Sequence, residues 1–80
     1  MTLDPQVSFG RVLRELRKAR GLTQEQLAFA ADVERNYVSL IERGLNQPAL
    51  KVFFRLADAL GCSPSELIYL VEVEMHSSKT

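Results

Sequence analysis

Apolar residues along the chain recur at intervals of three and four, the spacing of helices that bury one side. The clearest stripes are Phe9, Val12, Leu13 and Leu16 near the start, and Phe53, Leu56, Ala57 and Leu60 in the second half. No stretch alternates with period two for long enough to predict a strand. The pattern therefore predicts an all-α fold of five helices.

Residues that end and begin helices divide the chain into these five segments. Each amphipathic run is followed by a glycine suited to a left-handed helix end, at Gly21, Gly44 and Gly61. Two pairs have the spacing of a capping box, Thr23 with Gln26 and Ser63 with Glu66. The expected helices cover about residues 6–20, 24–31, 34–43, 49–60 and 64–75, and residues 76–80 are expected to form a frayed tail.

Length and composition fit one small globular domain. The chain has 80 residues, of which 46% are hydrophobic, so residues 1–80 are expected to form a single domain with its core at about 6–75. The single cysteine excludes an intrachain disulfide and favours a reducing compartment. Because no apolar run approaches the roughly 18 residues of a membrane span and no signal peptide begins the chain, we expect a cytoplasmic, nucleoid-associated protein without a membrane partner.

The residue types that carry chemistry in enzymes do not form a set in this sequence. The one cysteine, Cys62, and the one histidine, His76, have no third catalytic or metal-ligating partner beside them, and no glycine-rich phosphate loop occurs. We therefore expect no catalytic residue, no metal, no cofactor and no enzyme activity. Cys62 lies in a turn beside a helix cap, where a small structural residue is expected.

Charge is balanced overall but uneven along the chain. Residues 1–55 carry nine lysines and arginines against six acids, whereas residues 56–80 carry one lysine against four acids. The net charge of zero argues against a general polyanion binder. A basic front half can nevertheless hold phosphates.

The segment 34–43 has an apolar side that can be buried and a polar side that has nothing to bury. At 100° per residue, the apolar side gathers Tyr37, Val38 and Ile41, and the polar side gathers Asn36, Ser39 and Arg43 with Arg35 and Leu40 beside them. A helix this short is not stable alone, so its apolar side must pack. Its polar side suits the major groove of DNA, which is about 12 Å wide and admits one helix.

Residues 9–67 resemble the Xre family, the Cro/repressor-type helix-turn-helix regulators of bacteria. The matching segments are FGRVLRELRKARGLTQEQLA, VERNYVSLIERG, Pro48–Leu50 and LADALGCSPSEL. The resemblance implies a lambda-repressor-like five-helix fold whose second helix lies across the DNA backbone while the third enters the major groove. Double-stranded DNA is the implied partner.

The resemblance also implies roles for residues in and around the third helix. Base edges would be contacted by Arg35, Asn36, Ser39 and Leu40, because arginine pairs with guanine, asparagine with adenine, and an apolar side chain can touch a thymine methyl. Phosphates would be held by Gln24, Arg43 and Asn46. Arg17 and Glu42 are implied to form a structural ion pair that orients the third helix.

Four positions depart from the family pattern. Asp32 replaces the usual glycine of the turn, where a positive φ is expected. Glu34 replaces the usual serine or threonine cap, and it can either accept a hydrogen bond from cytosine or repel a phosphate. Phe29 and Ala30 stand where charged residues are common.

The last helix carries more apolar surface than one buried face requires. Leu67, Ile68 and Val71 are expected to face the core, and the opposite side then displays Tyr69, Leu70 and Val73. Such a patch predicts a twofold homodimer. Two third helices would then meet a palindromic operator whose half-site centres lie about 34 Å apart. We expect no room for a small-molecule effector domain.

A second interpretation is a protein-interaction module, such as an antitoxin or an assembly subunit that uses the helix-turn-helix as a scaffold. The neutral net charge and Glu34 favour this interpretation. The polar set of Arg35, Asn36 and Ser39 argues against it, because a protein-binding face is usually more apolar. The main expectation is a sequence-specific, DNA-binding transcriptional regulator.

Overall fold

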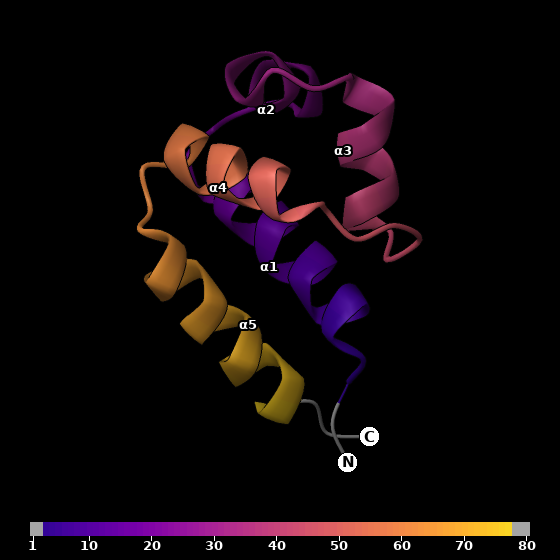
Figure 1. Ribbon diagram of the computed structural model, residues 1–80, viewed down its shortest axis with the longest axis vertical. Coiled ribbons are helices and arrows are strands. Elements are labelled where there is room, and N and C mark those ends of the chain that lie inside the picture. The colour runs from indigo at the N-terminus through magenta and orange to yellow at the C-terminus, as the bar shows by residue number, and fades with distance from the viewer. Residues whose placement is uncertain (1–2, 78–80) are drawn as a thin grey trace.

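The computed structural model describes residues 3–77, which form five helices and no strand (Figure 1). The helices are α1 (Pro5–Ala19), α2 (Gln24–Ala31), α3 (Arg35–Glu42), α4 (Leu50–Ala59) and α5 (Pro64–Ser77). The all-α, five-helix prediction is confirmed. The expected tail begins too early, because α5 continues through His76 and Ser77, and the remaining tail residues 78–80 lie outside the described residues.

The helices pack around one core to which each of them contributes. Figure 1 shows α1 and α5 lying side by side, with α2 and α3 together at the other end of the molecule and α4 between α2 and α5. The largest fully buried side chains are Leu13, Leu27, Ile41, Leu56, Leu60 and Leu67. None of the helices described is long and apolar enough to cross a membrane.

Side-chain caps mark the starts of α2 and α5. At the start of α2 the Gln26 N–H donates to Thr23 Oγ1 at 3.0 Å and the Thr23 N–H donates to Gln26 Oε1 at 2.9 Å, so the expected capping box is present. At the start of α5 only half of the expected capping box is formed: the Glu66 N–H donates to Ser63 Oγ at 3.1 Å, but the Glu66 carboxylate lies 3.8 Å from Cys62 Sγ instead of accepting from the Ser63 N–H. Burial, and then the charge of Glu66, raises the pKa of the Cys62 thiol, which therefore stays protonated at neutral pH.

The turn between α2 and α3 contains the left-handed residue that the sequence predicts. Asp32 has φ 58° and ψ 48°, and it is the one non-glycine residue with a positive φ among residues 3–77. The next residue, Val33, is half-buried and packs against the core. The turn is therefore anchored by an apolar side chain immediately after the strained residue.

Gly10, an unfavourable residue within a helix, marks the closest approach of α1 to α3. A Cβ added at Gly10 would lie 2.3 Å from Ile41 O and 3.0 Å from Glu42 O, both backbone atoms of the last turn of α3. Real Cβ atoms do not approach backbone oxygens so closely. Glycine is therefore required here by packing, and this requirement outweighs its low helix propensity.

We expect Gly10→Ala to lower the free energy of unfolding by about 2 kcal/mol, although alanine is the better helix former. The added methyl group must push the last turn of α3 away from α1. Urea unfolding followed by circular dichroism measures the loss.

Gly21→Ala is the matched control for this substitution. Gly21 has a φ of +70° and nothing within 4 Å of an added Cβ, so only backbone strain of roughly 1 kcal/mol is expected. If Gly10→Ala cost no more than Gly21→Ala, the tight crossing of α1 and α3 would be contradicted.

Candidate nucleic-acid interface

The polar side of α3 is open to solvent while its other side is buried. Arg35 and Asn36 lie in the first turn and are exposed, and Ser39 and Leu40 follow one turn later and are half-buried. The buried side consists of Val38, Ile41 and Glu42. The four residues expected to contact bases therefore lie on the accessible side of one short helix, a surface called here the base-reading face.

The start of α3 lacks a side-chain cap. Glu34 occupies the N-cap position with φ −81° and ψ 147°, but its side chain makes no capping hydrogen bond and is exposed. Its carboxylate therefore stands free beside Arg35. One turn further on, Tyr37 is half-buried and its hydroxyl accepts a hydrogen bond from the Ala49 N–H at 3.4 Å, which links α3 to the start of α4.

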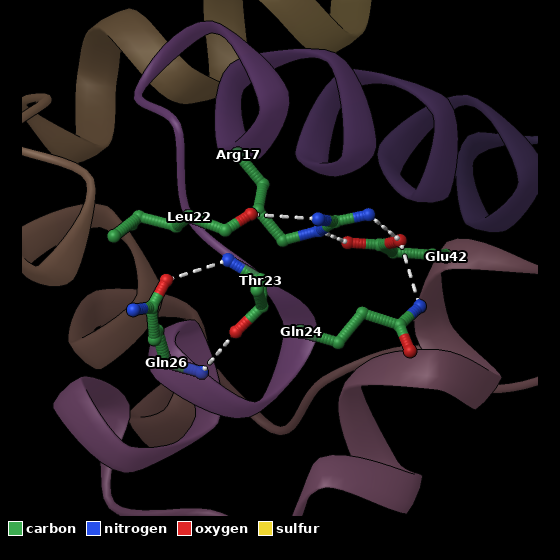
Figure 2. Close-up of polar contacts among 6 residues, drawn as sticks. All are labelled: Arg17, Leu22, Thr23, Gln24, Gln26 and Glu42. Atoms are coloured by element: carbon green, nitrogen blue, oxygen red, sulfur yellow. Dashed lines mark hydrogen bonds and ion pairs between the residues drawn. The ribbon is translucent and has the colours of Figure 1, made fainter.

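A buried ion pair connects α1 to the last turn of α3. Arg17 Nε donates to Glu42 Oε2 at 2.6 Å, and Arg17 Nη2 donates to Glu42 Oε1 at 3.1 Å (Figure 2). Arg17 Nη1 also donates to the Leu22 carbonyl at 2.8 Å, just before α2. The side chain of Glu42 is 2% exposed. A charge so deeply buried requires its partner, so this bidentate contact holds α3 against α1.

Gln24, the residue expected to contact a phosphate from the start of α2, also contacts Glu42. Its Nε2 donates to Glu42 Oε1 at 3.0 Å, and Figure 2 shows its amide nitrogen pointing toward Glu42. The capping box uses the N–H groups of Thr23 and Gln26. The N–H groups of Gln24 and Glu25, at the first two positions of α2, are left without a partner inside the helix, where the helix dipole also favours an anion.

The loop after α3 is attached to the first turn of α1. Gln6 Nε2 donates to the Gly44 carbonyl at 2.8 Å, and a Cβ at Gly44 would lie 3.3 Å from Cγ2 of Val7. Gly44 has a φ of +75°, which allows the chain to turn sharply at this contact. Arg43 and Asn46, the other residues expected to contact phosphates, flank the turn and are exposed.

The apolar surface of α5 differs from the predicted one. Ile68, expected in the core, is 53% exposed, and it lines an open apolar groove together with Leu50 and Phe54 of α4. Leu70, expected on the outer side, is half-buried and packs against the core. Tyr69 and Val73 are exposed. The buried strip of α5 is thus rotated from the expected one: it follows Leu67, Leu70 and Val71, because α5 packs chiefly against α1 and leaves Ile68 at the edge of the groove beside α4.

Sequence reasoning missed Gln6 and the bond between Gln24 and Glu42. The bonded partners are separated by 38 and 18 residues, respectively, and no local pattern signals a contact at such distances. Among residues 3–77, no three His, Cys, Asp or Glu side chains gather in a way that could hold a metal ion. The structure therefore adds two positioning contacts around α3 to the residues that the sequence singles out.

Comparison with known proteins identifies the fold around α2 and α3. A family model described as helix-turn-helix matches residues 13–67. Control protein C.BamHI from Bacillus amyloliquefaciens is 36% identical over 69 residues, which cover 85% of this chain and 85% of that protein. An uncharacterized helix-turn-helix-type transcriptional regulator from Sinorhizobium fredii is 35% identical over 66 residues, covering 82% of this chain and 86% of that protein.

Solved structures agree with these relatives. The restriction-modification controller protein C.AhdI from Aeromonas hydrophila is 48% identical, with a TM-score of 0.75 over 78% of this chain and 94% of that chain. The controller protein C.Esp1396I, solved as a tetramer in complex with its natural 35 base-pair operator, is 25% identical, with a TM-score of 0.83 over 91% of this chain and 96% of that chain. The chain belongs to the Xre-type helix-turn-helix family of DNA-binding transcriptional regulators, which are not enzymes.

Proposed function

We propose that this regulator acts as a homodimer on a palindromic operator, in the manner of a restriction-modification controller, with α3 of each protomer in one major groove. The observation that carries the proposal is the base-reading face, which is polar and accessible although the other side of α3 is buried. Exposed polar residues on a helix held by its opposite side match the geometry of a recognition helix. A scaffold that bound protein through α3 would present a more apolar surface.

The chemistry of the base-reading face assigns a role to each residue. Arg35 donates two hydrogen bonds to guanine O6 and N7, and Asn36 pairs with adenine N6 and N7. Ser39 and Leu40 lie one turn further along, where a hydroxyl can bond a base or phosphate and an apolar side chain can touch a thymine methyl. Phosphates are contacted by Gln24 at the start of α2 and by Arg43 and Asn46 after the end of α3, and these contacts set the register of α3.

The groove between α4 and α5 is the proposed dimer surface. Leu50, Phe54 and Ile68 expose apolar side chains around it, and Tyr69 and Val73 are exposed on a neighbouring part of α5 outside the groove. Gln47 and Pro48 from the loop after α3 also line the groove. A second copy of the chain seated there would bring its own α3 near the same loop, as a twofold pair of recognition helices requires.

The controller role rests on the relatives. C.AhdI and C.Esp1396I, both restriction-modification controllers, are matched over almost their whole length. The tetramer of C.Esp1396I on one operator indicates that proteins of this fold assemble on DNA in several copies. We infer that this chain regulates a restriction-modification operon by occupying an operator of at least two half-sites.

We expect Arg35→Ala to weaken binding to an operator selected from random DNA by roughly 10- to 100-fold, with little change on unrelated DNA, because a bidentate pair with guanine is worth about 1–3 kcal/mol. Arg43→Ala should instead weaken binding to the operator and to unrelated DNA alike. It should also reduce by about one the slope of the logarithm of the binding constant against the logarithm of salt concentration. Fluorescence anisotropy at several salt concentrations measures these effects. Arg55→Ala, which removes an exposed arginine of α4, is the control. Unchanged sequence preference in Arg35→Ala would remove that assignment.

We expect Ile68→Glu to convert the dimer to a monomer, because it buries a carboxylate against apolar side chains in the proposed interface. Val73→Glu should weaken the dimer less. Sedimentation equilibrium measures the dissociation constant. Phe29→Glu is the matched control, since Phe29 is an apolar residue of α2 that is 88% exposed and lies outside the groove. A dimer of unchanged strength in Ile68→Glu would exclude this surface.

A further inference from the structure

One carboxylate near the end of α3 joins three helices. Arg17 of α1 donates to both oxygens of Glu42, and Gln24 of α2 donates to Oε1 at 3.0 Å. The Glu42 side chain is almost completely buried. Glu42 therefore determines the position of Gln24 as well as that of α3, and the ion pair with Arg17 accounts for only part of its contacts.

The chemistry of the carboxylate determines which way the Gln24 side chain faces. An ionised carboxylate accepts hydrogen bonds but cannot donate them, so it selects the orientation in which the amide nitrogen of Gln24 faces inward. Figure 2 shows the nitrogen of Gln24 toward Glu42 and the carbonyl oxygen turned away. The nitrogen carries two N–H groups, and Glu42 uses one of them. The second N–H is therefore held near the start of α2.

The surroundings of Gln24 suit a phosphate once its side chain is held. The N–H groups of Gln24 and Glu25 begin α2 without partners inside the helix. The guanidinium of Arg17 offsets the charge of Glu42, so the buried carboxylate adds little repulsion toward a phosphate. A glutamine without the Glu42 contact would rotate freely and would lose side-chain entropy on meeting DNA.

We propose that Glu42 is a positioning residue for the phosphate contact of Gln24. It holds the carboxamide before DNA arrives and links the α2 phosphate contact to the base-reading face of α3 at a fixed separation. This inference rests on the proposed contact between Gln24 and DNA. It gives Glu42 a part in DNA binding beyond holding the fold.

A thermodynamic cycle tests the proposal. The parent variant replaces the ion pair by apolar residues of similar size, Arg17→Met with Glu42→Leu, because such a replacement preserves folding better than removal of one partner. In the unmodified protein Gln24→Ala should weaken operator binding by about tenfold, as expected for a hydrogen bond to a charged group. In the parent variant, where Gln24 has lost its acceptor, Gln24→Ala should have little further effect.

Arg43→Ala is the matched control for the cycle. Arg43 is exposed and makes no contact with Glu42 among the hydrogen bonds of the described residues, so its loss should cost the same in both backgrounds. A full tenfold effect of Gln24→Ala in the parent variant would overturn the proposal and leave the proposed function intact. Failure of the unmodified protein to bind any operator would instead overturn the proposed function.

Nuclear magnetic resonance of the free, unmodified protein provides a test that needs no variant. The side-chain amide of Gln24 should be nearly as rigid as the backbone on the nanosecond scale, whereas that of Asn36, which is exposed and lies outside the proposed dimer groove, should be mobile. Nitrogen-15 relaxation of the two side-chain amides measures this difference. Equal mobility of Gln24 and Asn36 would overturn the proposal, because the carboxamide would then not be held before binding.

Discussion

The helix-turn-helix of this protein depends on the burial of one negative charge. Glu42 is removed from water, so its carboxylate requires partners, and these come from α1 and α2. Satisfying the carboxylate therefore fixes α3 relative to both neighbours at once. The helices α2 and α3 have eight residues each and would not be stable alone. Their arrangement comes from this contact together with the apolar core beneath them.

Local patterns predicted the elements of the fold, because the burial of one helix side is written at intervals of three and four residues. The capping box at Thr23 and the left-handed turn at Asp32 were also predictable, because each depends on residues that are close in sequence. Contacts between distant residues were not, and the bond from Gln6 to Gly44 has no signal in one sequence. Ile68 was placed wrongly because periodicity gives the residues that share a side of α5, but not how far α4 covers that side. The DNA contacts of Arg35, Asn36 and Ser39 stay predictions.

The loop after α3 belongs to two surfaces at once. Gly44 is held by Gln6, and Asn46 stands exposed near the end of the base-reading face. Gln47 and Pro48 of the same loop line the apolar groove between α4 and α5, and Gln6 lines it as well. The proposed dimer surface and the end of α3 therefore share one short segment of backbone. In the proposed dimer, this segment would be a direct route by which self-association could influence DNA binding.

The crossing at Gly10 has a consequence for how such a protein can be retargeted. Here α1 touches the backbone oxygens of Ile41 and Glu42, not the side chains of the outer face of α3. The attachment of α3 at this crossing is therefore independent of the residues on its outer face. Residues on the outer face of α3 could therefore be substituted to change the preferred operator without altering the packing of α3 against α1.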